Sequence, residues 1–301
     1  MRRSLVVVVV ICLVAACGVV DLAREATRRP SLGEAVGFYL PRLATALGAD
    51  QRLAALHIQA TGAEAYRPDG RGVAITGTTV RSVTAAAAAA TAAGVPLPAL
   101  DPAGALATAV PLAAAEGCPA LERISLDVAP SGAVIALARC TEPARSVQLG
   151  PDGVYRDLDL TSGAGITGAA REVLTLLPRD ATITALFLGP APDGSGAILD
   201  VTVAPPCGAG CAEVRLTRRA TAAGGTLMVV TTTPTAGGPL SAPVSDADPD
   251  RLAAVYQGTL HKCGLVAFVS LVSEDGRVPV SYTHLRAHET DSYLVCRLLL
   301  E

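Results

Sequence analysis

Residues 121–140 read LERISLDVAPSGAVIALARC, and this stretch decides the fold that the sequence predicts. An alternating apolar run leads into a turn rich in proline, serine and glycine, and a second β-prone run follows it. Alternation with a period of two is typical of a strand with one buried face, and a short connection containing glycine joins two such strands. The stretch therefore predicts an antiparallel β-hairpin that turns at Gly132, because glycine tolerates a positive φ.

The same order of run, turn and run occurs three more times along the chain. The other stretches are LHIQATGAEAYRPDGRGVAIT (residues 56–76), ITALFLGPAPDGSGAILDVTV (183–203) and LVAFVSLVSEDGRVPV (265–280), with turn glycines Gly72, Gly196 and Gly276. Further strands are expected at residues 146–149, 213–218 and 226–232. The sequence therefore predicts a repeated hairpin unit.

A helical pattern precedes each hairpin. The four segments are residues 31–47, with an interruption at Pro41, and residues 102–116, 165–177 and 249–261. Asp101 and Asp248 stand where helix N-caps are expected. A separate alanine-rich helix is expected at residues 83–93.

These elements predict an α+β fold built from repeated α-β-β-β modules with antiparallel sheets, preceded by a signal peptide. Three modules are complete and a fourth begins. The expected limits are 1–16 for the signal peptide, 17–30 for the anchor and tether, 31–100, 101–160 and 161–231 for the modules, 232–248 for a linker, 249–279 for the fourth module and 280–301 for a non-native tail.

The order of elements resembles the PepSY-like and cystatin-like modules of secreted bacterial proteins. The resemblance lies in the order of helix and strands and not in a residue motif. It implies an extracytoplasmic α+β protein, and by analogy it leaves open a protease-inhibitor-like activity.

The N-terminal segment MRRSLVVVVVICLVAACG, residues 1–18, predicts export from the cytoplasm. Two arginines precede an apolar core at residues 5–14, which has the length of a signal-peptide core. The following VAAC, residues 14–17, resembles the bacterial lipobox. The resemblance implies that Cys17 carries acyl groups and anchors an extracytoplasmic protein to the membrane. An uncleaved anchor over residues 4–20 is the alternative.

The composition resembles that of a protein from a high-GC bacterium of actinobacterial type. Lys262 is the single lysine among 24 basic residues, tryptophan is absent and aromatic residues make up 3% of the chain. A net charge of −3 gives no reason to expect a nucleic acid partner.

The last stretch, residues 280–301, reads VSYTHLRAHETDSYLVCRLLLE. Back-translated with ordinary codons, it resembles the adapters of short-read sequencing libraries, which implies a natural chain that ends near Pro279. Two other interpretations remain open. His284 and His288, four residues apart, could bind zinc with Cys296, or the segment could be a polar helix.

Five cysteines between the anchor and the tail are candidates for disulfide bonds, because exported cysteines are usually oxidised. They are Cys118, Cys140, Cys207, Cys211 and Cys263. A bridge between the first two would join a helix end to a strand end, and the next two could close a tight loop. Cys263 would pair with a cysteine beyond the chain, or with one of that second pair. Zinc binding by this set is the alternative, but no metal or other cofactor is expected.

The sequence lacks the motifs of familiar metalloproteases, hydrolases and nucleotide-binding enzymes. Asp157 and Asp159 could share a strand face for acid–base work, although a solvated face is the simpler interpretation. We therefore expect a lipid-anchored binding or envelope-assembly protein without catalytic activity, whose ligand is a protein, a peptide or an envelope component. The alternatives are an extracytoplasmic enzyme that lacks C-terminal residues and a secreted protease-inhibitor-like module.

Overall fold

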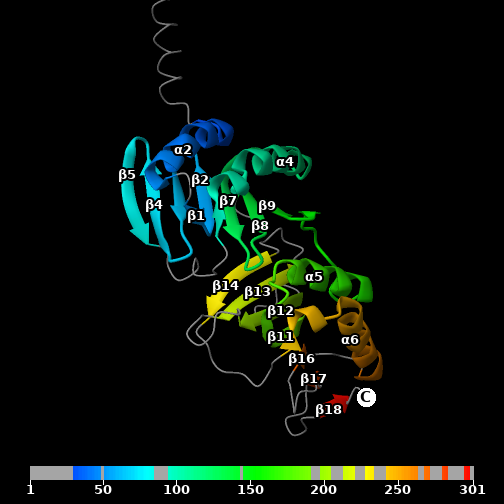
Figure 1. Cartoon of the computed structure of the whole chain (residues 1–301). Helices are drawn as coiled ribbons and strands as arrows, with labels where there is room; N and C mark the ends of the chain where they lie inside the picture. Colours follow the sequence, from blue (N-terminus) through cyan, green and yellow to red (C-terminus); the bar gives the residue numbers. More distant parts are fainter. Residues whose placement is uncertain are drawn as a thin grey trace, which may run out of the picture.

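The computed structural model describes residues 30–48, 51–84, 94–142, 145–190, 197–204, 213–220, 228–233, 242–263, 268–271, 280–283 and 295–298. These residues form helices and two large antiparallel sheets (Figure 1). A helix followed by antiparallel strands occurs four times in succession. The α+β fold with repeated modules is therefore confirmed, while the residue limits of the modules stay a prediction.

The first sheet is built from two modules. The first module contains α2 (Leu32–Leu47), β2 (Ala55–Gln59), β3 (Gly62–Tyr66), β4 (Arg71–Thr76) and β5 (Thr79–Thr84). The second contains α4 (Pro102–Ala115), β7 (Leu121–Val128), β8 (Val134–Cys140), β9 (Ser146–Gly150) and β10 (Gly153–Val154). Between them lie β1 (Arg52–Leu53), β6 (Val95–Pro96) and α3 (Leu97–Leu100).

The two modules share one continuous sheet, with the strand order β10-β9-β8-β7-β2-β3-β4-β5. The first strand of each module lies at the centre, where Leu56 pairs with Leu126 and Ile58 pairs with Ile124. Counted outward from this central pair, the strand order is the same in both directions. The unit therefore has the topology of an intramolecular dimer of modules.

The second sheet repeats this plan. One module contains α5 (Gly163–Thr175), β11 (Thr182–Pro190), β12 (Ala197–Ala204), β13 (Glu213–Ala220) and β14 (Met228–Thr233). The other contains α6 (Pro249–Cys263), β16 (Phe268–Leu271), β17 (Val280–Thr283) and β18 (Val295–Leu298), and β15 (Ala242–Pro243) and η1 (Val244–Asp246) precede it. The first strands, β11 and β16, again pair at the centre.

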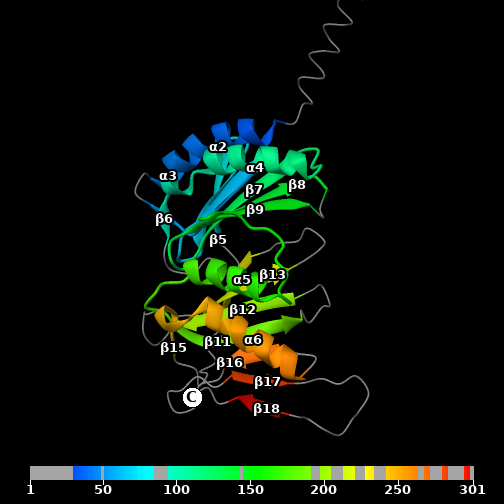
Figure 2. The ribbon, with the colours of Figure 1, turned by 90° about the vertical axis from the view of Figure 1, so that its right-hand side faces the viewer.

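The core of the first unit lies between the sheet and one layer of helices. The apolar residues of α2 recur at helical spacing, and Leu43 and Leu47 pack with Leu56 and Ile58. A capping box starts this helix, in which the Glu34 N–H donates to Ser31 Oγ at 3.2 Å and the Ser31 N–H donates to Glu34 Oε2 at 2.6 Å. Both α2 and α4 cover the same face of the sheet (Figure 2).

The second unit lies on the side of the first sheet that faces away from α2 and α4 (Figures 1 and 2). Gln148 of β9 is buried, donates to the Met228 carbonyl at 2.8 Å, and accepts from the Met228 N–H at 2.6 Å. Ala129 and Ile135 of the first unit belong to the core cluster of the second. The edge strand β14 therefore meets the helix-free face of the first sheet.

Both predicted aspartate caps are confirmed. Asp101 Oδ1 accepts from the Gly104 N–H at 3.0 Å, and Asp248 Oδ1 accepts from the Asp250 N–H at 2.9 Å. The interruption at Pro41 was wrong, because α2 continues through it. Proline removes the hydrogen bond to the Gly37 carbonyl, but Gly37 lies on the exposed side of the helix, where that carbonyl is accessible to solvent.

The predicted alanine-rich helix was wrong at its start. Val83 and Thr84 end strand β5, where Val83 pairs with Gly72 of β4. β-branched residues favour a strand that can extend an existing sheet, and here that tertiary pairing decides. Residues 85–93 lie outside the described part of the chain.

An apolar span, Leu97–Ala115, is long enough by length and composition to cross a membrane. Asp101 divides it into α3 and α4, because its backbone is left-handed at φ 42°. Leu106 and Ala109 of α4 are buried in the core of the first unit. The span therefore includes a core helix that packs on the first sheet.

The turn of the first hairpin differs from the prediction. Gly70, with φ 79°, makes the turn, while Gly72 lies inside β4. A Cβ on Gly72 would overlap the Ala65 carbonyl oxygen of the neighbouring strand, so close approach and not positive φ explains this glycine. The predicted turn at Gly132, with φ 87°, is confirmed, and Gly196 and Gly276 lie outside the described residues.

We expect Gly72→Ala to lower the free energy of unfolding by about 2 kcal/mol, because the neighbouring strand would have to move. Gly37→Ala is the matched control, since its Cβ would meet open space on an exposed helix position. That control should stabilise the chain by up to about 1 kcal/mol. Urea unfolding of both variants checks this, and equal effects would contradict it.

Candidate functional site

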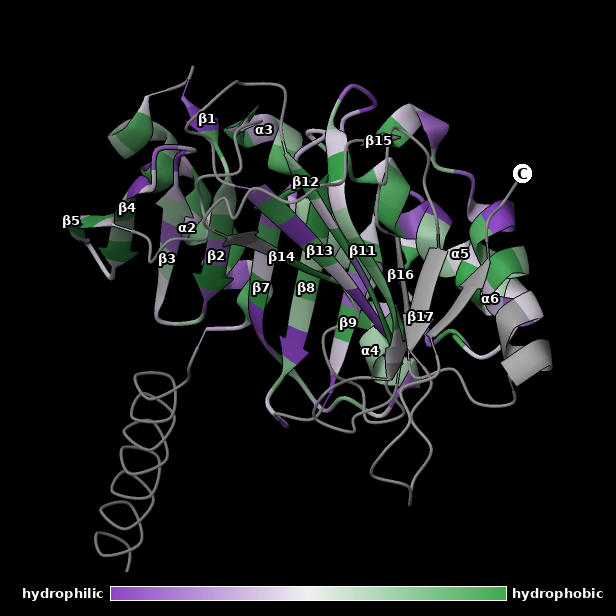
Figure 3. Ribbon diagram, turned by 90° about the horizontal axis from the view of Figure 1, so that it is seen from below, coloured by the Kyte–Doolittle hydropathy of each residue, from purple (hydrophilic) through white to green (hydrophobic). Residues whose placement is uncertain are grey.

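The helix-free face of the first sheet carries an ordered set of polar side chains, which we call the polar face. Strand alternation and register place its members on one side, opposite the core residues of α2 and α4. Hydrophilic and hydrophobic segments alternate along β7 and β8 (Figure 3). The members are Gln59, His57, Glu64, Tyr66, Arg81, Arg123, Ser125, Asp127 and Arg139.

His57 lies at the centre of the polar face. Its Nε2 is 3.6 Å from Asp127 Oδ1, and the two side chains are 24% and 50% exposed. Its ring meets the Tyr66 ring edge-on, with centroids 5.8 Å apart. The register explains the grouping, because Ala55 of β2 pairs with both Tyr66 and Asp127 and so places them on either side of the strand that carries His57.

Tyr66 is held by a neighbour on its own strand. Its hydroxyl donates to Glu64 Oε2 at 2.8 Å. Burial raises the pKa of Tyr66 above its usual value, and the hydrogen bond and negative charge of Glu64 raise it further. Arg123 and Arg81 act in the opposite direction, so both guanidinium groups lie within electrostatic reach of this hydroxyl.

This pKa shift predicts a loss of stability at alkaline pH. Tyrosine ionises near pH 10 in the unfolded chain, and the folded chain keeps that proton to a higher pH. The contribution of Tyr66 to stability is therefore fully present below about pH 10 and is lost as pH rises through the folded pKa. The absorbance at ~295 nm of the natural chain and of Tyr66→Phe is measured as the pH is raised. The difference between the two titrations reports the ionisation of Tyr66, and its midpoint should lie above about pH 10. A midpoint at or below that value would contradict the shift.

Ser125, His57 and Asp127 are residue types of a catalytic triad on one sheet face. Ser125 is only 7% exposed, and it pairs with His57 in the strand register. The Nε2 atom of His57 lies 3.6 Å from Asp127 Oδ1, and among the described residues no hydrogen bond joins His57 to Ser125. In the part of the chain that the structure describes, the three residues do not form a nucleophile–base pair.

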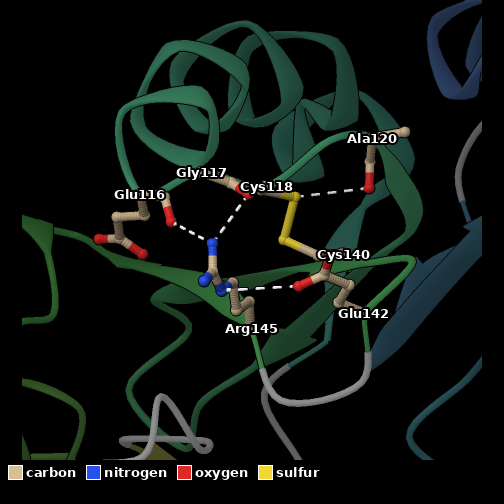
Figure 4. The surroundings of a disulfide bond; sticks show 7 residues. All are labelled: Glu116, Gly117, Cys118, Ala120, Cys140, Glu142 and Arg145. Atoms are coloured by element: carbon tan, nitrogen blue, oxygen red, sulfur yellow. Dashed lines mark hydrogen bonds and ion pairs between the residues drawn. A yellow bond between two sulfur atoms is a disulfide. The ribbon is translucent and has the colours of Figure 1, made fainter.

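The disulfide candidates separate into one observed pair and three others. Cys118, after α4, is bonded to Cys140 at the end of β8 (Figure 4). Arg145 lies beside the bond and donates to the carbonyls of Glu116 at 2.7 Å and Gly117 at 2.8 Å. Cys207 and Cys211 lie outside the described residues, and Cys263 ends α6.

The remaining sequence candidates lie elsewhere. Cys17, His284 and His288 are outside the described residues, and Cys296 lies on β18. Among the described residues, no group of three histidine, cysteine, aspartate or glutamate side chains could hold a metal ion.

Asp157 and Asp159 lie in a connection and not on a strand, so a shared strand face was wrong. Asp159 Oδ1 accepts from the Thr161 N–H at 2.9 Å and also from the Thr161 hydroxyl. These hydrogen bonds lower the pKa of Asp159. Residues 155–159 form neither a helix nor a strand and lead to α5.

A buried ionic network at the junction of the two units was missed by sequence reasoning. Arg218 of β13 is fully buried, and its Nε donates to Glu172 Oε2 of α5. Its other nitrogens donate to the carbonyls of Arg219 and Arg156. The signal was present in the sequence, because Arg218 has the same strand parity as the buried Val214 and Leu216.

A scan against protein-family models finds no match, and a search of curated proteins finds no match either. The polar face presents partly exposed charged and aromatic groups, whereas the ionic network is enclosed and connects α5, β13 and the chain segment between the units. The polar face is the candidate functional site, and the ionic network is structural.

Proposed function

We propose that the chain is a lipid-anchored extracytoplasmic binding protein, without catalytic activity of its own, that uses the polar face to hold an envelope ligand. The observation that carries the proposal is the placement of α2 and α4 on one face of the first sheet. The other face is left with partly exposed His57, Tyr66 and Asp127 at spacings fixed by strand register.

The pairing of these side chains favours recognition. His57 lies against Asp127, and Tyr66 donates to Glu64, so each group is oriented before a ligand arrives. Binding sites combine aromatic surface with a few oriented polar groups, and sites on strands are more precise than sites on loops. The arrangement therefore suits a ligand that lies on the sheet and meets both hydrogen-bonding groups and an aromatic ring.

The anchor rests on the resemblance of residues 14–17 to the lipobox. Twelve residues lie between Cys17 and residue 30, where the described chain begins (30 − 17 − 1 = 12). Fully extended, such a tether spans at most about 45 Å. This length allows the two units to turn the polar face away from the membrane and toward other envelope components.

Anchoring is tested by Cys17→Ser in a bacterial host that processes lipoproteins. We expect the variant to lose incorporation of labelled fatty acid and to leave the detergent-extracted membrane fraction. Cys12→Ser is the matched control, because Cys12 lies in the apolar core of the signal segment and outside the lipobox. Retained labelling in Cys17→Ser, or equal loss in both variants, would overturn the lipoprotein assignment.

Binding is tested with a photo-crosslinking residue placed at two exposed positions of the first unit. Gln59 lies on the polar face, and Ala46 lies on the outer side of α2. Incubated with isolated cell envelopes and irradiated, the probe at Gln59 should form discrete adducts that the probe at Ala46 does not form. Identical patterns at both positions would show that the polar face is not the binding surface.

A further inference from the structure

Two arginines on the polar face stand directly opposite each other on neighbouring strands. Arg123 of β7 pairs with Arg139 of β8 in the strand register. Side chains at such positions have Cβ atoms about 5 Å apart, and like charges placed there destabilise a sheet. The pair therefore does not stabilise the sheet, which suggests that the two arginines have another role.

Neither guanidinium has a protein partner within the described residues, in contrast to several other arginines of the chain. Arg145 donates to two carbonyls, and Arg218 is paired with Glu172. The two carboxylates of the polar face contact other groups, Asp127 with His57 and Glu64 with Tyr66. In the described part of the chain, neither carboxylate forms an ion pair with Arg123 or Arg139, so the arginine pair keeps its donors for a ligand.

One neighbour of the pair adds to its capacity for anions. Arg81 carries a further positive charge on the same face, but it lies on β5, with β2, β3 and β4 between it and Arg123. Gln59 lies on β2, on the side of β7 opposite β8, and it pairs with Arg123 in the strand register. Gln59 is exposed, and its amide can donate hydrogen bonds. Arg139 is exposed and Arg123 is half-buried, so a ligand can reach both.

We infer that Arg123 and Arg139, with Gln59 beside them, bind the phosphate group of a soluble or cell-wall ligand; the inference rests on the proposed function and names its ligand class. Two guanidinium forks offer donors to several oxygens at once, and their combined charge matches a phosphate better than a single carboxylate. A bound phosphate would also remove the repulsion between the two arginines.

The position of the second unit favours a soluble ligand over a bilayer as the source of this phosphate. Arg139 pairs with Ser146 of β9, and Gln148 of the same strand contacts Met228 of the second unit. The second unit extends from this side of the sheet (Figure 2). A flat membrane would meet the second unit before it reached the arginine pair, whereas a single phosphate group on a soluble ligand can enter beside it.

The test is a titration of the full chain, held in detergent, with inorganic phosphate at constant ionic strength. Binding is measured from the NMR signals of the arginine Nε–Hε groups. Arg123→Gln and Arg139→Gln should each weaken phosphate binding about ten-fold. Arg71→Gln is the matched control, because Arg71 is an exposed arginine of the same unit that lies near Asp69 at 3.9 Å. Equal affinity in all three variants and the natural chain would overturn the inference.

Thermal unfolding separates loss of the site from loss of the fold. Without phosphate, Arg139→Gln should unfold at or above the temperature of the natural chain, because a like-charge pair has been removed. Phosphate should raise the unfolding temperature of the natural chain and of Arg71→Gln but not of Arg139→Gln. A lower unfolding temperature of Arg139→Gln in the absence of phosphate would contradict the repulsion on which the inference rests.

The two proposals fail in different ways. If the arginine variants bind phosphate normally while the probe at Gln59 still forms specific adducts, the phosphate site is wrong and the binding function stands. If phosphate binds as expected but Gln59 and Ala46 give identical adducts, the binding function is wrong. The arginine variants could also bind phosphatidylglycerol vesicles less tightly than the natural chain while their affinity for inorganic phosphate is unchanged. That result would overturn the choice of a soluble ligand.

Discussion

Replacing Arg218 with methionine is expected to lower the free energy of unfolding by about 3 kcal/mol. Arg218 is fully buried, and it joins Glu172 of α5 to the Arg156 carbonyl in the segment that connects the two units. Methionine has similar length but cannot pair, so the Glu172 carboxylate would keep its charge without a partner. Its side chain is 25% exposed and can reach some water, which places the loss at the lower end of the usual range.

Urea unfolding of the full chain measures this loss, and Arg171→Met is the matched control. Arg171 lies on α5 next to Glu172, but it is 63% exposed and pairs with Asp250 at 3.2 Å. Such an exposed pair contributes less than about 1 kcal/mol. Similar losses for the two variants would show that the buried pair is no more important than a surface one.

A double replacement tests the origin of the effect. Arg218→Met combined with Glu172→Leu removes both charges, so no buried carboxylate remains without a partner. The double variant should recover most of the stability lost by Arg218→Met, because hydrophobic replacements of buried ion pairs are often close to neutral. A double variant that loses the sum of the two single losses would mean that the two side chains act independently.

Loss of the Cys118–Cys140 bond has the second large expected effect. The bond closes a loop with a sequence separation of 22 residues that contains β7, the strand at the centre of the first sheet. By the chain-entropy account, removing such a crosslink lowers the free energy of unfolding by about 3 kcal/mol. The end of α4 keeps its hydrogen bonds to Arg145, so the folded structure should survive the change.

The measurement compares the natural chain with Cys118→Ser/Cys140→Ser in urea, each with and without a reductant. The natural chain should lose stability on reduction by at least as much as the double variant loses by mutation. Any further change of the double variant on reduction would report bonds formed by the other cysteines. A loss below about 1 kcal/mol in the double variant would contradict the crosslink account.

Local features of this fold could be predicted from the sequence, and its long-range features could not. Asp101 and Asp248 were identified as caps because a cap depends on a few adjacent residues. The pairing of β2 with β7 was not predicted, because alternation shows which face of a strand is buried but not which strand lies beside it. The repeated modules could be predicted, but their fusion in pairs into shared sheets could not.

The polar face was missed for the same reason. The sequence does not single out His57, because its contacts Tyr66 and Asp127 come from two other strands. Once the sheet order is known, the register brings the three together. Arg218 is different, since its place on a buried strand face could have been recognised from the alternation around it.

The central pairing of first strands also determines the order in which the chain can complete its structure. Ile58 of β2 pairs with Ile124 of β7, a partner 66 residues later (124 − 58 = 66). Until that partner has been synthesised, β2 presents an open edge that other extended chains can join. The first sheet is therefore complete only when two modules are present, and a chain that carries one module exposes this edge to aggregation.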